Sequence, residues 1–202
     1  MKTAEKALCL ALILTILFTF SGFTACCEDI PNHVLRLHVL ANSDSSADQS
    51  LKLKVRDCIL KESAGLLDGV TDKTNAEKVV SEQIPKLQKA AAAEINKQGY
   101  NYPVKVTLTN MYFTTRQYDS VTLPAGRYDA LRVTIGSGKG HNWWCVIFPP
   151  MCLPAAEKQE ELKDVLNKDE LNITENQSGY IVKFKTVEAY EQLKEWLKNK
   201  NS

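Results

Sequence analysis

The residue types best suited to chemistry gather in one stretch, GKGHNWWCVIFPPMC, which covers residues 138–152. Its notable members are His141, Trp143, Trp144, Cys145 and Cys152. A histidine beside a carboxylate could transfer protons, two cysteines could form a disulfide, and tryptophan is enriched where proteins bind one another. The stretch therefore raises three hypotheses: an active site, a cross-linked loop or a binding surface.

The enzymatic hypothesis needs partners for His141. An exported hydrolase or wall-modifying enzyme could use His38, His141 and Asp44 if all three side chains reached one pocket. The chain has no H-E-x-x-H and no G-x-S-x-G motif, and GSGKGH departs from the phosphate-binding P-loop at Val133 and Gly140. The C-x6-C spacing is not a zinc signature either. We therefore expect no enzymatic activity, no metal and no cofactor.

The consecutive residues Trp143 and Trp144 must point to opposite faces if they lie on a strand. With helices on only one face of the sheet, one indole would lie in the core and the other on the outer face. This arrangement favours a partner contact at Trp144. A small-molecule sensor with an apolar pocket behind Trp143 is a further alternative.

Cys145 and Cys152 flank a Pro149-Pro150 bend that could bring their Cα atoms close enough for a disulfide. Such a bond would suit an oxidising compartment. Two buried thiols are the alternative, and the sequence leaves the choice open.

Residues 1–25 are typical of an export signal, because Lys2 and Lys6 precede the apolar run ALCLALILTILFTF. Cleavage after Ala25, lipidation of Cys26 within Phe-Thr-Ala-Cys, and retention as a membrane anchor are three alternatives. Each places the rest of the chain outside the cytoplasm. Cleavage after Ala25 would leave equal numbers of basic and acidic residues, which argues against nucleic-acid binding.

The first half of the folded region reads as a strand followed by helices. Alternation predicts a strand over 34–40, then a polar loop and a helix over about 46–61 with Cys58 in its apolar stripe. The start of this helix could present free N–H groups to an anion. A second helix begins at the Thr74-x-x-Glu77 capping box, is bent or split at Pro85, and ends at Gly99.

The second half is richer in strands. We predict strands over 102–108, 130–135, 143–148 and 180–184, with the middle two paired as a hairpin around GSGKG. Helices are predicted over 154–167 and from Thr186, and the inward side chains of the last helix would be Val187, Tyr190, Leu193 and Leu197. The expected fold is α+β, a single domain over 30–200 with a mostly antiparallel sheet and helices covering one face.

Two long blocks resemble the stage II sporulation protein R family of endospore-forming Firmicutes. They are LRLHVLANSDSSADQSLKLKVRD, residues 35–57, and GRYDALRVTIGSGKGHNWWCVIFPPMC, residues 126–152. YIVKFKTVEAYEQL near the C-terminus is a weaker match. The resemblance implies a signalling protein that is made in the forespore and exported into the space between forespore and mother cell. There it would activate a membrane-embedded aspartic protease of the mother cell, which cleaves a sigma-factor precursor.

The resemblance brings no binding residues with it, so side-chain chemistry alone selects the expected contacts with this partner. The first group lies on the predicted first strand and in the loop after it, and the second lies in and after the glycine-rich loop: Arg36, His38, Asn42, Asp44, Lys139, His141 and Trp144. The protein would act close to a membrane, and residues 1–25 are the segment that could hold it there.

Overall fold

The computed structural model describes residues 3–118, 121–150, 166–175 and 177–200. The chain separates into two compact units. The first comprises residues 1–30, 113–126 and 167–202, and the second comprises residues 31–112 and 127–166. The α+β class predicted from the sequence is confirmed.

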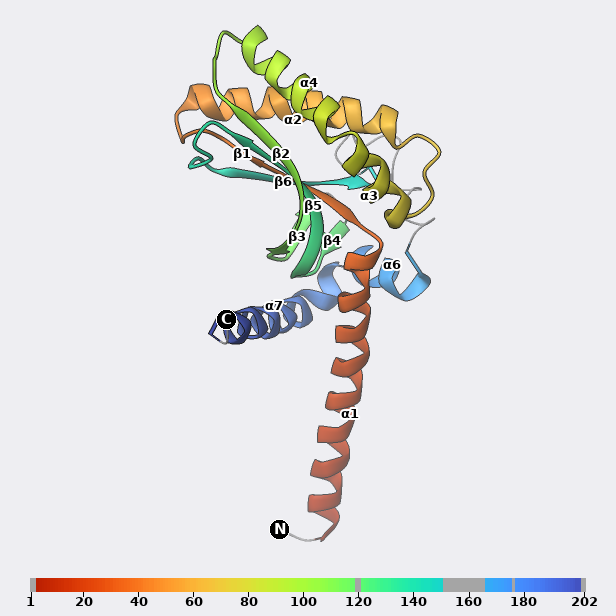
Figure 1. Ribbon diagram of the computed structural model, residues 1–202. Coiled ribbons are helices and arrows are strands. Elements are labelled where there is room, and N and C mark those ends of the chain that lie inside the picture. Colours follow the sequence, from red (N-terminus) through yellow and green to blue (C-terminus); the bar gives the residue numbers. More distant parts are fainter. Residues whose placement is uncertain (1–2, 119–120, 151–165, 176, 201–202) are drawn as a thin grey trace. The chain divides into compact units, whose positions relative to one another are not determined.

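The second unit is built on a four-stranded mixed sheet in the order β2-β5-β1-β6 (Figure 1). These strands are β1 (Leu35–Leu40), β2 (Val104–Phe113), β5 (Gly126–Ile135) and β6 (Asn142–Phe148). β1 pairs in parallel with β5 and antiparallel with β6. All six residues of β1 are buried, which is typical of a strand covered on both faces.

The central position of β1 corrects one prediction. The segments 130–135 and 143–148 were expected to pair as a hairpin, but β1 lies between the strands that contain them. Every residue of β1 is buried, Arg36 and His38 included, so this strand takes the centre and β5 and β6 flank it. The short connection between β5 and β6 must consequently pass over the end of β1.

Three helices cover one face of this sheet: α2 (Ser46–Leu66), α3 (Lys73–Glu82) and α4 (Ile84–Lys97) (Figure 1). Residues at helical spacing pack against alternate residues of the strands. The helices contribute Leu51, Val55, Ile59, Leu87, Ala91 and Ile95, and the strands contribute Leu35, Leu37, Val39, Leu131, Val133 and Ile135. Helices on one face of the sheet are therefore confirmed for this unit.

The ends of these helices mostly follow the sequence signals. Ser45 caps α2, and Pro85 lies in the first turn of α4, so the predicted long helix is split. Gly99, with φ of 82°, ends α4. The predicted capping box at Thr74 is wrong, because Asp72 accepts the hydrogen bond from the backbone N–H of Asn75 instead.

The first unit contains α1 (Thr3–Asp29), the antiparallel pair β3 (Arg116–Tyr118) and β4 (Val121–Leu123), α6 (Lys168–Glu175) and α7 (Gln177–Lys200). The short 3-10 helix η1 (Ile30–Asn32) follows α1. A small apolar cluster joins α1, α6 and α7 through Phe23, Cys27, Ile173, Phe184 and Val187. Across the described residues, no helix combines the length and apolarity needed to cross a bilayer.

Two predictions fail in the first unit. Residues 180–184 belong to α7 and not to a strand, so the helix begins well before Thr186. Its buried face is set by Phe184 and Val187, which leaves three side chains that were predicted to face inward exposed: Tyr190, Leu193 and Leu197. Most of the helix predicted over 154–167 falls outside the described residues.

Candidate functional site

The two chemically rich segments of the sequence meet at one corner of the second unit. We call this the loop corner and define it as residues 41–45, between β1 and α2, and residues 136–141, between β5 and β6. The backbone N–H of Gly140 donates to the carbonyl of Ala41 over 3.0 Å, and that of Lys139 donates to the carbonyl of Asn42 over 3.3 Å. The crossing that places β1 at the centre of the sheet thus brings the segments together.

Close approach of the two loops depends on glycine. A Cβ atom at position 140 would lie 2.2 Å from the backbone oxygen of Ser43, where only glycine fits. At Gly136, φ is 56°, a left-handed conformation that glycine adopts without strain. Asn42 fastens this end of the loop, because its side-chain oxygen accepts from the backbone N–H of Ser137 at 3.0 Å.

Asp48 holds the inner side of the loop corner. This buried residue lies in the first turn of α2, where its Oδ2 accepts from Asn42 Nδ2 at 2.8 Å and from Ser43 Oγ at 2.6 Å. These hydrogen bonds, that of Ser43 foremost, hold the pKa of Asp48 below its ordinary value. The side chain of Ser45 caps the helix by accepting from the backbone N–H of Asp48. The first turn of α2 therefore already contains a buried carboxylate, that of Asp48.

On the outer side, Asp44 and His141 form a pair. Oδ1 of Asp44 lies 2.5 Å from Nδ1 of the imidazole and also accepts from the backbone N–H of His141. That backbone hydrogen bond is the main cause that lowers the pKa of Asp44. The side chains are 55% and 80% exposed, so the pair is available to a partner. Lys52 supports it from below by donating to the carbonyl of His141 over 2.9 Å.

The two tryptophans project to opposite faces of the sheet, as alternation along β6 requires. Trp143 lies beside α2, where the guanidinium of Arg56 is 4.3 Å from the ring centroid, and remains 36% exposed. Trp144 is half-buried on the other face and stacks on His38. The more exposed indole is thus Trp143, which the sequence analysis did not select as a contact.

The structure divides the seven predicted contact residues by exposure. Asp44, Lys139 and His141 are exposed, and Asn42 and Trp144 are half-buried. Arg36 and His38 are 0% and 3% exposed, so both lie within the sheet and not on its surface. Arg36 lies with its Cζ 4.8 Å from the ring centroid of Tyr128 on β5.

The geometry also bears on the hydrolase alternative, which required three converging side chains. Asp44 and His141 are paired, but His38 is buried on β1 and stacks on Trp144. Burial lowers the pKa of His38 to about 4. A neutral imidazole stacked in this way serves the packing of the sheet.

Both segments that build the loop corner lie in the part of the chain that matches known proteins. Residues 31–158, which contain both loops, match the family described as "Stage II sporulation protein R". The chain belongs to the stage II sporulation protein R family. A relative named "Stage II sporulation protein R" from Bacillus subtilis (strain 168) is 34% identical over 168 residues, which are 81% of this chain and 75% of the relative. No solved structure matches.

Family membership confirms the resemblance found in the sequence and gives the chain a role in sporulation. The matched residues end before α6 and α7, so the family match covers the sheet and helices of the second unit together with β3 and β4 of the first. Both halves of the loop corner lie inside it.

The cysteines of interest lie in both units: Cys145 in the second, and Cys26 and Cys27 in the first. Cys145 on β6 is disulfide-bonded, whereas Cys152, its predicted partner, lies outside the described residues, so the pairing stays a prediction. Cys26 packs half-buried against the apolar cluster of the first unit, and burial raises the pKa of its thiol. Burial also raises the pKa of the neighbouring Cys27 to about 12. Lipidation of Cys26 is likewise still a prediction.

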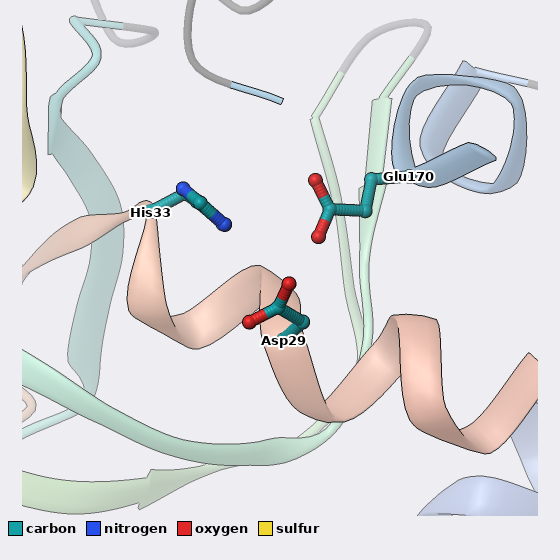
Figure 2. Close-up of side chains that lie close together, drawn as sticks. All are labelled: Asp29, His33 and Glu170. Carbon is teal, nitrogen blue, oxygen red and sulfur yellow. The ribbon is translucent and has the colours of Figure 1, made fainter. Parts of the chain in front are cut away.

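Figure 2 shows the polar side chains of Asp29, His33 and Glu170. Asp29 at the end of α1 and Glu170 on α6 both belong to the first unit, and their carboxylate oxygens lie within 4.8 Å of each other. His33, also drawn, belongs to the second unit. Glu170 accepts from the backbone N–H of Asn167, whose side chain in turn caps α6. We therefore assign this carboxylate a structural role in starting the helix.

Sequence reasoning missed several residues that form the corner. Asp48 and Gly140 could have been suspected, since an acidic residue in the first helical turn and a glycine in a tight loop are common signals. Lys52 and Arg56 gave no such signal, because their partners lie 89 and 87 positions later in the chain. Lys52 and Arg56 meet these partners only because β1 lies beside β6 in the sheet.

Proposed function

We propose that this stage II sporulation protein R family member is an exported signalling protein that activates a membrane-embedded aspartic protease of the mother cell. The protease would then process a sigma-factor precursor. The chain would act in the space between forespore and mother cell, with the loop corner against the outward-facing part of the protease. Family membership supports the sporulation setting.

The observation that carries the proposal is the exposed Asp44–His141 pair on a rigid base. Its lower layer consists of the buried side chains of Asp48 and Lys52, each of which hydrogen-bonds to one of the two loops. Loops fixed on a rigid scaffold are frequent binding elements, and a preformed surface loses little freedom on binding. The contact between the two side chains, being exposed, adds little stability. Recognition is the role that its position favours.

The surface proposed to contact the protease combines polar side chains with one exposed aromatic ring. Lys139 and His141 offer donors, Asp44 offers an acceptor, and Trp143 adds exposed ring surface nearby on β6. Interfaces commonly combine a large aromatic anchor with satisfied polar groups. To activate the protease, this surface must bind its active state more tightly than its inactive state, since equal affinity would shift nothing.

Reconstitution in a non-sporulating host would test the proposal. The full chain, with its N-terminal segment, is co-expressed with the membrane protease and the sigma-factor precursor, and precursor cleavage is measured. Cleavage should depend on the chain, and Asp44→Ala with His141→Ala should reduce its rate by about tenfold or more, the loss typical of one contact hot spot. Lys89→Ala, exposed on α4, is the matched control and should be unaffected.

Two results would contradict the proposal. The first is full cleavage with the doubly substituted chain, once its export and folding are shown. The second is precursor cleavage by the chain in cells that lack the membrane protease. That second result would support the hydrolase alternative, for which the Asp44–His141 pair would be the first residues to examine.

A further inference from the structure

The last helix of the chain, α7, carries apolar side chains on a face that the first unit leaves uncovered. They are Tyr190, Leu193, Trp196 and Leu197, exposed by 46%, 54%, 56% and 47%. We call this set the α7 stripe. Among the described residues, every exposed large apolar side chain apart from Trp143 lies on α7 or α1.

The α7 stripe is distinct from the face by which the helix joins its own unit. Phe184 and Val187 form the buried face, and the ring of Phe184 meets that of Phe23 edge to face at 5.4 Å between centroids. At 3.6 residues per turn, Leu193, Trp196 and Leu197 fall on the side of the helix away from these two residues, and Tyr190 lies between the two faces. The helix therefore has one apolar face for its own core and another for a different surface.

Charge around the α7 stripe is arranged by sign. Lys200 borders it, with its Nζ 5.1 Å from the ring centroid of Trp196. Lys194 lies at its edge, with Nζ 5.7 Å from the ring centroid of Tyr190, and also pairs with Glu28 and Glu191. The acidic residues Glu188, Glu191 and Glu195 are half-buried or buried, and helical spacing places them across the helix from the α7 stripe. A surface that fits this pattern is apolar beneath and negatively charged at its rim.

We infer that α7 lies on a lipid surface with anionic headgroups, its tryptophan, tyrosine and leucines in the interface and its lysines at the headgroups. Aromatic rings with polar edges and lysines with long apolar stems are the side chains that suit this boundary. The same unit offers a second apolar surface on α1, at Leu8, Leu10, Leu12 and Leu14. α1 and α7 pack together and run in different directions (Figure 1).

This surface is separate from the proposed contact with the protease. α7 belongs to the first unit and the loop corner to the second. A vesicle assay contains no protease, so its outcome does not depend on the proposed function.

The decisive measurement places a single tryptophan on the α7 stripe. In the full chain, Trp143→Phe and Trp144→Phe leave Trp196 as the remaining tryptophan. Its emission should shift to shorter wavelength with vesicles of phosphatidylglycerol and phosphatidylethanolamine, and brominated lipid should quench it. The shift should be weaker with phosphatidylcholine alone. An emission spectrum that neither shifts nor is quenched in the presence of bound vesicles would overturn the inference, even if α1 holds the protein there.

Charge introduced into the α7 stripe gives a second test. Leu193→Glu in the same background should raise the lipid concentration needed for half the spectral change by about tenfold, the loss expected from one large apolar contact. Gln192→Glu adds the same charge to an exposed position beside the α7 stripe and should have a smaller effect. Far-UV circular dichroism checks that the helix persists in both variants.

A protein contact would give a different pattern. If the α7 stripe joins two copies of the chain, sedimentation without lipid will show a dimer that Leu193→Glu converts to a monomer, and vesicles will leave the spectrum of Trp196 unchanged. Those two results together would show that the α7 stripe binds a second copy of the chain and not lipid, and would overturn the inference.

Discussion

The imidazole of His38 lies flat against the indole of Trp144, with ring centroids 3.8 Å apart and ring planes inclined by 3°. The two residues are opposite each other in the antiparallel pairing of β1 and β6. Burial is the main cause that lowers the pKa of His38, and the charge of Arg132 on β5 adds to it. The stack is therefore built for an uncharged histidine.

This relationship predicts how stability depends on pH. The pKa of His38 is about 4 in the folded protein and about 6.5 in the unfolded chain, so the unfolded state binds its proton first as pH falls. Its contribution is fully present above pH 6.5 and declines as pH falls toward 4, by roughly 3 kcal/mol in all. His38→Phe keeps the stacked ring and should remove this decline. Urea unfolding at pH 7 and pH 4.5 measures it, and equal losses in both proteins would refute the assignment.

Glycine at position 140 should be essential to the docking of the two loops. In Gly140→Ala the new methyl group would collide with the backbone of Ser43, so the variant should lose about 1–3 kcal/mol of stability. It should also weaken precursor cleavage, because His141 is the next residue. Gly65→Ala in α2 meets nothing within 4 Å and should gain about 0.5–1 kcal/mol. Thermal unfolding compares the two, and a neutral Gly140→Ala would show that the loops can separate without cost.

Asp48 should stabilise the protein in its ionised form. Its lowered pKa means that this stability is present above the unfolded value of about 4 and is lost as pH falls through the folded value. Asp48→Asn should cost about 1–3 kcal/mol at pH 7, since the hydroxyl of Ser43 loses its charged acceptor. Asp57→Asn, at a side chain 62% exposed, should change stability by less than about 0.5 kcal/mol. The difference between these variants should shrink as pH falls below the ordinary pKa of an aspartate and the carboxylate of Asp48 takes up a proton.

Trp143 should matter more for activation than for folding. Its ring is 36% exposed and is covered in part by Arg56, an arrangement that leaves one edge for a partner. Trp143→Ala should lower precursor cleavage by about tenfold while its unfolding free energy falls by only about 1 kcal/mol. Trp144→Ala, which removes the stack on His38, should show the reverse balance. Cleavage assays beside unfolding curves separate the two effects.

Local signals predicted most of the second unit. The alternation of Leu35, Leu37 and Val39, the cap at Ser45 and the break at Pro85 act within a few residues, so the sequence shows them directly. The order of the strands could not be predicted in this way. A loop of few residues normally joins adjacent strands, and only the burial of β1 on both faces reverses that preference here.

The first unit shows the opposite situation. Tyr180, Val182 and Phe184 alternate as in a strand, yet the whole segment is helical. Its helical face is defined by Phe184 and Val187 packing on Phe23, a residue more than 150 positions earlier that the sequence analysis assigned to the export signal. Alternation over five residues is a weak signal when the element that it must pack against is unknown.

The central position of β1 also has a consequence for the order of folding. Residues 35–40 emerge early in synthesis, but their partners on either side are residues 130–134 and 142–148. The middle of the sheet can close only after nearly three quarters of the chain is available, and such distant pairing slows folding. A protein exported as proposed would therefore remain unfolded while it crosses the membrane. Its signalling surface would form only after export.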